Sequence, residues 1–437
     1  MGRKNWLILI LFIFSLTIVF QGCTLNKKKT TKSDSSVVIW HMMVDRQEAF
    51  EELADKYAKE RGVKVEFKLF FPPDIYSQKV IAAARAGNLP DIFGILGEKK
   101  TVASFIRAGH IANLTPYLKE NNDEWENRFY PLALNVTAFQ SNNVYGVEEG
   151  FYGIPLDMMN VQWVYNRDLL KKAGFNSDEP IIYFDQFVNM AKSVKEKLGV
   201  SGFICGWGEP WLMYSLCTEW AINLMGEEKF FLTLKGKVPY TDPDWIKVFS
   251  LFERLKNEGI LADNIVTIIN KEAEDSFSKG NALFSFNGSW AVNVYRQLAP
   301  DLDYSFFPLP RISDEFPVKI WGGAGFSFMV YPRSPKKELA IEFLKWITEV
   351  PQQKFLVKAT NNLPAIRGCE DVLSGHLGDL FDDIDCLTHP NIWPYEEDSR
   401  VIEIMGRVLQ QIVIGIKTPQ SAAEEIQNTK NRVMGEK

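Results

Sequence analysis

Residues 36–70 read SVVIWHMMVDRQEAFEELADKYAKERGVKVEFKLF, and this stretch decides the fold. The β-branched run Ser36–Trp40 predicts a buried strand. Apolar residues recur at helical spacing over Asp45–Arg61, and Gly62 follows them where a helix commonly ends. The alternating segment 63–70 predicts a second strand. A strand, a helix and a strand in this order predict two parallel strands joined by a crossover.

The same rhythm continues for one more unit. Residues 76–86 predict a second helix closed by Gly87, and a third strand follows over residues 89–95. Three strands alternating with two helices predict a parallel, doubly wound α/β sheet. Ligands of such sheets bind beyond the carboxyl ends of the strands. The loops after Trp40 and Phe93 are therefore candidate site loops.

Further elements are expected along the rest of the chain. Strands are expected at 161–165, 282–286 and 326–331, and helices at 167–173, 184–198, 245–257, 272–280, 337–348, 401–414 and 421–431.

Length and charge set limits on the class of protein. The chain has 437 residues, more than one hydrophobic core of about 250–300 residues accommodates, so two domains are expected. Its formal net charge is −6, which argues against nucleic-acid binding because phosphate recognition needs a basic surface. Aromatic residues make up 13% of the chain, enough to suggest aromatic surface beyond packing.

The N-terminus has the pattern of an export signal. Arg3 and Lys4 precede the apolar run Trp6–Phe20, which is shorter than the ~18–20 residues of a membrane-spanning helix. Residues 1–22 therefore predict a signal peptide. The sequence Phe20-Gln21-Gly22-Cys23 resembles a bacterial lipobox, with Phe20 in place of the usual leucine, and this implies lipidation of Cys23. A plain signal peptide or a short anchor helix is the alternative. The polar stretch to residue 36 completes a flexible tether over 23–36.

The remaining cysteines are Cys205, Cys217, Cys369 and Cys386. Their number and spacing fit neither a disulfide framework nor a metal motif. A Cys369–Cys386 bridge and four free, mostly buried thiols both remain open.

Five blocks together resemble a known family. They are AAARAGNLPDIF (82–93), IRAGHIANLTPYL (106–118), YGIPLDMMNVQWVYNRDLLKKAGF (152–175), FSKGNALFSFNGSW (277–290) and WGGAGFSFMVYPRSPKKELAIEFLKWI (321–347). In this order they resemble the extracellular solute-binding lipoproteins of ABC importers, of the maltodextrin-binding type. The resemblance covers nearly all of residues 37–437.

The resemblance implies two doubly wound α/β lobes with a hinge and an interlobe cleft, a periplasmic-binding-protein-like fold of type II. Lobe 1 is expected at 37–156 plus 322–372, and lobe 2 at 161–320 plus 375–437. The chain crosses between lobes near Leu156–Asn160 and Trp321–Gly325. Closure about this hinge would enclose the ligand.

Sugar binding needs aromatic faces for C–H patches and carboxylates or amides for hydroxyls. The segment ICGWGEPWLMYS (204–215) contains Glu209-Pro210-Trp211, which is similar to an acid-proline-aromatic element at the family's cleft wall. Trp211 and Glu209 are therefore expected ligand contacts, whereas Trp207 is assigned to core packing. Trp290, after Gly-Ser, and Trp321, before Gly-Gly, are the other expected aromatic contacts.

Further positions match family contacts less specifically. Asp45 and His41 lie in the loop after the first strand, where Asp45 alternatively caps a helix. Glu98 follows the third strand, with a solvated surface role as its alternative, and Asp91 is expected to organise the strand end. Asn160 lies at the first crossing, and Trp393 with Tyr395 would form a late aromatic wall.

The predicted function is the lipid-anchored, substrate-binding component of an ABC importer, which captures a saccharide, most simply an oligosaccharide. Its partners would be the saccharide, the permease subunits and the bacterial cell membrane, on whose outer face a monomer would be anchored. No catalytic residue, metal site or cofactor is predicted, since Gly-x-Ser-x-Gly and His-Glu-x-x-His are absent. A sugar-binding sensor or adhesin, or a secreted carbohydrate-active enzyme, is the alternative. An acidic sugar would require a cation such as Arg46 or Arg367, and glycerol phosphate esters also stay open.

Overall fold

A computed structural model describes residues 36–95, 99–143, 145–373, 375–388 and 397–435. The predicted signal peptide, Cys23 and the tether up to residue 35 lie outside the described residues. Within the described ranges, no helix is both long and apolar enough to cross a bilayer.

The first sheet is the predicted doubly wound one. Its strand order is β2-β1-β3-β12-β6. The strands are β1 (Val37–His41), β2 (Val65–Leu69), β3 (Ile92–Phe93), β6 (Ile154–Pro155) and β12 (Ser327–Val330). β1 runs parallel to both β2 and β3, as predicted, whereas β12 is antiparallel to β3 and β6.

Helices α1 (Gln47–Arg61) and α2 (Pro73–Ala86) form the crossovers between these strands. α1 buries the apolar face predicted from its spacing, and Gly62 ends it in the left-handed region at φ 71°. Both crossovers start at the sheet edge where β1 and β2 end, so the loops after His41 and Leu69 open on one side of this lobe.

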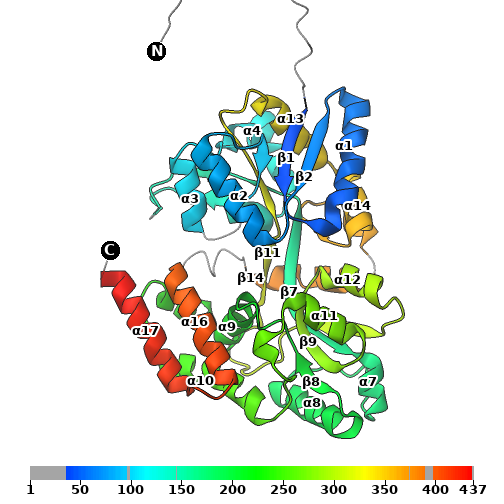
Figure 1. Ribbon diagram of the computed structural model, residues 1–437, viewed down its shortest axis with the longest axis vertical. Coiled ribbons are helices and arrows are strands. Elements are labelled where there is room, and N and C mark those ends of the chain that lie inside the picture. The colour runs from blue at the N-terminus through cyan, green and yellow to red at the C-terminus, as the bar shows by residue number, and fades with distance from the viewer. Residues whose placement is uncertain (1–35, 96–98, 144, 374, 389–396, 436–437) are drawn as a thin grey trace, which may run out of the picture. The chain divides into compact units, whose positions relative to one another are not determined.

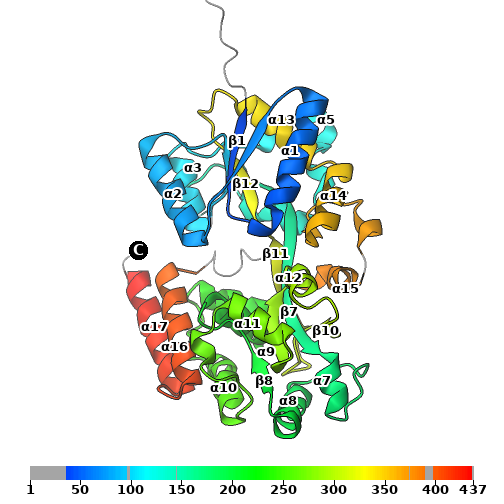
Figure 2. The same cartoon turned by 45° about the vertical axis from the view of Figure 1, so that its right-hand side comes forward.

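The second sheet is built around one long strand, β7 (Asp157–Asn166). Its order is β14-β11-β7-β9-β8, and β10 and β13 also pair with β7. The other members are β8 (Ser201–Ile204), β9 (Ala282–Gly288), β10 (Tyr304–Phe307), β11 (Ile320–Ala324), β13 (Leu363–Pro364) and β14 (Leu387–Thr388). Helices α8 (Phe184–Leu198) and α9 (Trp211–Leu234) pack against its strands, and α10 (Pro243–Asn257), α16 (Ser399–Val413) and α17 (Pro419–Gly435) pack on one another on its left side in Figure 2.

Two large hydrophobic cores divide the described chain. One collects residues from Val37 to Met158 and from Ala324 to Leu380, and the other from Val161 to Trp321 and from Val401 to Val433. The helix α15 (His376–Asp382), expected in the second lobe, contacts both lobes. Its Leu377 and Leu380 pack in the first core, whereas the ring of His376 lies 4.0 Å from that of Tyr304 in β10 of the second sheet.

The strands β7 and β11 cross between these cores as an antiparallel pair. Trp321 lies opposite Val161, and Gly322 opposite Asn160. A Cβ on Gly322 would lie 2.7 Å from the Met159 carbonyl oxygen, so only glycine allows this close approach. The pairing of β7 with β11 at the crossing is therefore close and depends on this glycine, and β13 pairs with β7 on its other side at Asp157 and Met158.

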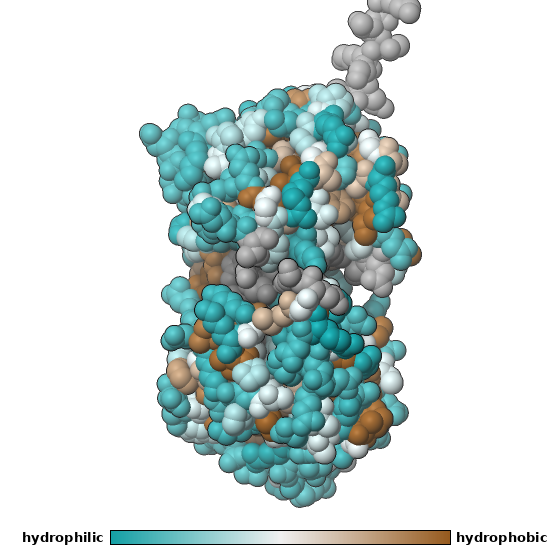
Figure 3. All heavy atoms as spheres, turned by 90° about the vertical axis from the view of Figure 1, so that its left-hand side faces the viewer, coloured by the Kyte–Doolittle hydropathy of each residue, from teal (hydrophilic) through white to brown (hydrophobic). Residues whose placement is uncertain are grey.

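The helix α9 is the main element that the sequence did not predict. Most of its residues are buried on all sides, so the polar face that marks an amphipathic helix is missing. Gly226, with φ 77°, interrupts it. The four cysteines of the described chain are free thiols, and Cys369 and Cys386 form no bridge. The face drawn in Figure 3 is mostly hydrophilic, with apolar side chains in small separate groups.

Candidate ligand-binding site

Three tryptophans from distant parts of the chain meet beside the crossing strands. Trp211 begins α9, Trp290 precedes α12 (Ala291–Leu298), and Trp321 lies in β11. The ring centroid of Trp211 is 5.8 Å from that of Trp290 and 6.2 Å from that of Trp321. Trp211 and Trp290 are half-buried, whereas Trp321 is buried. We call these three residues the tryptophan platform.

The loop before Trp211 explains why its sequence alternates glycine with aromatic and acidic residues. A Cβ on Gly206 would lie 2.4 Å from Cα of Asn270, and one on Gly208 would lie 2.8 Å from the Ile268 carbonyl oxygen. The two glycines therefore let this loop pass directly against the backbone before α11 (Asn270–Ser278). Trp207, between them, is fully buried against Phe203 and Phe252, which confirms its assignment to the core.

Glu209 fixes the ring of Trp211. Its Oε2 accepts a hydrogen bond from Trp211 Nε1 at 3.0 Å, and its Oε1 accepts one from the backbone N–H of Asn270 at 2.9 Å. Both carboxylate oxygens thus have partners within the protein. Glu209 therefore anchors the indole of Trp211, and its direct contact with a ligand stays a prediction.

Glu274, which the sequence analysis missed, does the same for Trp290. Its Oε1 accepts hydrogen bonds from Trp290 Nε1 at 3.0 Å, Asn287 Nδ2 at 3.0 Å and Asn270 Nδ2 at 2.8 Å. Burial raises the pKa of Glu274, while the hydrogen bonds donated by Asn287, Trp290 and Asn270 oppose that rise and favour the carboxylate. The ring of Trp290 also lies over Gly288, where a Cβ would be 1.9 Å from its Cζ3 atom. The sequence signal that could have identified Glu274 is its position four residues after Asn270, which places the two side chains on the same face of α11.

Trp321 is held through its backbone. Its N–H donates to Oε1 of Glu219 in α9 at 2.7 Å, and Glu219 is almost completely buried. Burial raises the pKa of Glu219 well above its ordinary value. Neither Glu219 Oε2 nor Trp321 Nε1 has a hydrogen-bond partner among the described residues.

Asn160 lies on β7 next to this cluster but is fully buried. Its side-chain Nδ2 donates to the Leu380 carbonyl oxygen at 2.9 Å, and its backbone carbonyl oxygen accepts from the Ser289 N–H. These contacts tie the crossing strand to α15 and to the turn before Trp290. Ligand contact by Asn160 stays a prediction.

The loop after β1 has a structural role in the first lobe. His41 is fully buried and its Nε2 donates to Gln47 Oε1 at 2.7 Å, while burial lowers its pKa to about 4. Asp45 is exposed, makes no capping hydrogen bond to α1, and lies 3.5 Å from Arg46 Nε. Direct ligand contact by His41 or Asp45 stays a prediction.

Arg46 is directed to the crossing strand. Its Nη2 lies 2.5 Å from Asp157 Oδ2, with both side chains largely buried, and also donates to Asn362 Oδ1 at 3.2 Å. This ion pair joins the loop after β1 to the first residue of β7. Asp91 has the predicted organising role, since its Oδ2 accepts from the Val38 N–H at 2.7 Å.

Glu98, Trp393 and Tyr395 lie outside the described residues. The first lobe nevertheless shows exposed apolar side chains that the sequence analysis did not name. Phe71 and Ile75 are 61% and 51% exposed at the carboxyl end of β2 and the start of α2. Next to them, Lys79 Nζ lies over the rings of Phe70 and Trp40.

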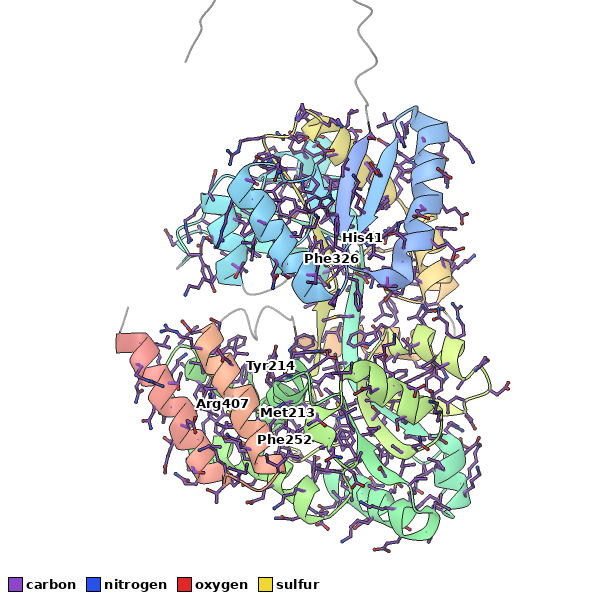
Figure 4. The ribbon with its side chains drawn as sticks, in the orientation of Figure 1. His41, Met213, Tyr214, Phe252, Phe326 and Arg407 are labelled. Carbon is purple, nitrogen blue, oxygen red and sulfur yellow. The ribbon has the colours of Figure 1, made fainter. Side chains whose placement is uncertain are left out.

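Figure 4 labels side chains from both lobes. His41 and Phe326 lie in the first lobe near the crossing, and Tyr214 lies on α9, one turn beyond Trp211. Within the described ranges, no group of three or more His, Cys, Asp or Glu side chains is arranged to hold a metal ion.

Two α/β lobes joined by paired crossing strands define the class of two-lobed, periplasmic-binding-protein-like folds. The family model described as "Bacterial extracellular solute-binding protein" matches residues 52–376, and the chain belongs to this family.

Relatives and solved structures agree on the class. The multiple sugar-binding protein of Streptococcus mutans is 20% identical, with 83% of each chain covered. The maltodextrin-binding protein of Bacillus subtilis is 22% identical, with 80% of this chain and 78% of that protein covered. A chitin oligosaccharide binding protein superposes with a TM-score of 0.76 at 20% identity, covering 91% of this chain and 98% of that one. The family and these relatives are binding proteins.

Proposed function

We propose that this chain is the substrate-binding component of an ABC importer and captures a saccharide, most simply an oligosaccharide, at the tryptophan platform. The observation that carries the proposal is the meeting of three indole rings, two of them half-buried, beside the strands on which the lobes would close. Aromatic faces suit the C–H faces of sugar rings, and burying aromatic area contributes strongly to binding. The sugar ligands named for the relatives support the same ligand class.

Closure would bring a wall of the first lobe against the bound sugar. Phe71 and Ile75, exposed at the carboxyl end of β2, are the apolar side chains in the position where open α/β sheets receive ligands. In this proposal they would cover the sugar face that the platform leaves open. Asp45 and Glu98 stay candidates for hydroxyl contacts from the same lobe.

Thermal unfolding in the presence of a panel of oligosaccharides tests the proposal. A ligand that binds only the folded protein raises the Tm by mass action. At least one saccharide should shift the Tm and be recovered unchanged after long incubation. Trp290→Ala should abolish that shift, while Tyr183→Ala, which removes an exposed aromatic from another surface, should leave it intact. No shift with any saccharide, or turnover of the bound one, would exclude this function.

Anchoring at Cys23 is a separate part of the proposal. Lipidation there would hold the protein at the outer face of the cell membrane, close to the permease. The wild-type protein should sediment with membranes and carry a diacylglyceryl mass addition, whereas Cys23→Ser should be released in soluble form. A sensor that does not feed a transporter is the remaining alternative, and uptake of the labelled sugar by cells lacking this protein would distinguish the two.

A further inference from the structure

Both half-buried rings of the platform are held by carboxylates. Glu209 accepts from Nε1 of Trp211, and Glu274 accepts from Nε1 of Trp290. The two acids are linked through Asn270, whose backbone N–H donates to Glu209 and whose side-chain amide donates to Glu274. The indole N–H groups are therefore already used, and these rings offer a ligand their faces and edges.

Among the residues that the structure describes, no Lys or Arg forms an ion pair with either acid. None of the ion pairs between described residues involves Glu209, Glu219 or Glu274, and the groups around Glu274 are amide, indole and carboxylate groups. The internal segments outside the described ranges, residues 96–98, 144, 374 and 389–396, contain no Lys or Arg in their sequence. A hidden arginine or lysine in those segments is thus excluded.

The two arginines considered for an acidic sugar have other partners. Arg46 pairs with Asp157 at 2.5 Å. Arg367 donates to the carbonyl oxygens of Asn127 and Phe129, and its guanidinium lies over the ring of Tyr130. Lys79, in the first lobe, is engaged with the rings of Phe70 and Trp40.

We propose that the site selects neutral saccharides and discriminates against uronate-bearing ones, because Glu209 and Glu274 place uncompensated negative charge behind the two indole rings. This inference rests on the proposed function and narrows its ligand class. A sugar carboxylate stacked on Trp211 or Trp290 would face like charge across a partly buried site, where Coulomb repulsion is only weakly screened. A neutral hydroxyl at the same place carries no such penalty.

Isothermal titration with matched probes tests the inference. The probes are maltotetraose, xylotetraose, cellotetraose, tetra-N-acetylchitotetraose and tetragalacturonate. At least one neutral tetrasaccharide should bind at least about tenfold more tightly than tetragalacturonate. Equal or tighter binding of the uronate overturns the inference while the saccharide function stands. If none of the probes and no other saccharide binds, the proposed function itself fails.

Charge-neutralising variants separate electrostatic selection from ring positioning. In Glu274→Gln the amide oxygen still accepts from the indole N–H of Trp290, whereas in Glu209→Gln the amide NH2 faces one of the two N–H donors that the carboxylate accepted. The readout is therefore the ratio of the uronate affinity to the neutral-sugar affinity within each variant, and not the neutral-sugar affinity alone. Affinity for tetragalacturonate relative to the neutral sugar should rise by about tenfold in each variant. Asp275→Asn removes a charge from the exposed side of the same helix α11. It should leave the ratio of the uronate affinity to the neutral-sugar affinity unchanged. A constant ratio in all three variants would show that the acids only position the rings, and would overturn the charge argument.

Discussion

Glu219 Oε1 accepts a hydrogen bond of 2.7 Å from the backbone N–H of Trp321, and this contact joins α9 to the crossing strand β11. The two residues are 102 positions apart in the chain. The carboxyl group has no ion-pair partner in the described part of the chain, and its burial raises its pKa well above the ordinary value. The neutral carboxyl is thus the form that fits the folded protein.

Replacing Glu219 should therefore raise or lower the free energy of unfolding, depending on whether the new side chain still accepts the hydrogen bond from Trp321. At pH values above the pKa that Glu219 has in the unfolded chain, its carboxyl group must take up a proton when the protein folds. The free energy of this proton uptake lowers the stability of the folded protein, by more as the pH rises. Glu219→Gln keeps the acceptor and avoids the cost, so its unfolding free energy relative to wild type should rise between pH 5 and pH 8. Glu219→Leu leaves the Trp321 N–H unsatisfied and should lose about 1–3 kcal/mol. Urea unfolding measures both, and a pH-independent difference between Gln and wild type would contradict the prediction.

The Arg46–Asp157 ion pair should contribute strongly to stability. Removing one partner leaves an unpaired buried charge, so Asp157→Ala should lower the unfolding free energy by about 3–5 kcal/mol. The double variant Arg46→Met, Asp157→Leu should lose less than Asp157→Ala alone. Asp275→Ala, which breaks the exposed pair with Lys279, should cost no more than about 1 kcal/mol. Equal losses for the buried and the exposed pair would refute this role.

His41 makes the first lobe sensitive to acid. Its folded pKa of about 4 lies below the unfolded value of 6.5, so the unfolded chain binds more protons in the window between these two pKa values. Stability present at pH 7 is therefore lost as the pH falls through this window, by about 2 kcal/mol at pH 5 from this residue alone. The unfolding free energy of wild type should fall between pH 7 and pH 5. In His41→Gln this fall should be smaller by about 2 kcal/mol, because the variant has no imidazole to protonate at this position.

Replacing each of the two tryptophans of the segment 204–215 should have a different effect, on stability for Trp207 and on sugar affinity for Trp211. Trp207 is fully buried, so Trp207→Ala should lose about 3–5 kcal/mol of stability. Trp211→Ala removes a half-buried platform ring and should lose less stability but at least tenfold in sugar affinity. Calorimetric unfolding and titration on the same preparations measure both quantities. Equal destabilisation by the two variants would reject the division into core and platform.

Local signals in the sequence predicted much of the first lobe. The β-branched run before His41, the helical spacing up to Arg61 and the glycine after it each act within a few residues, and the parallel register of β1 with β2 and β3 followed from their order. The helix α9 escaped because its residues are buried on all sides, which leaves no periodic contrast between apolar and polar positions.

The site was predicted less completely than the fold, for a related reason. Trp211, Trp290 and Trp321 were each named from short motifs, and the structure brings all three together. Glu219 and Glu274 were missed because their partners lie far away in the sequence or become neighbours only in the folded chain. Arg46, considered as a cation for an acidic sugar, pairs instead with Asp157, 111 positions further along the chain.

The contrast between buried and half-buried indoles also gives the protein an optical signal of its own. Of its 12 tryptophans, Trp163, Trp207, Trp220 and Trp245 are fully enclosed and should emit at short wavelength regardless of ligand. Trp211 and Trp290 are in contact with solvent, lie 5.8 Å apart and are hydrogen-bonded to carboxylates. A sugar that covers these two rings would displace water from them and shift their emission to the blue, so occupancy could be followed by intrinsic fluorescence without a label.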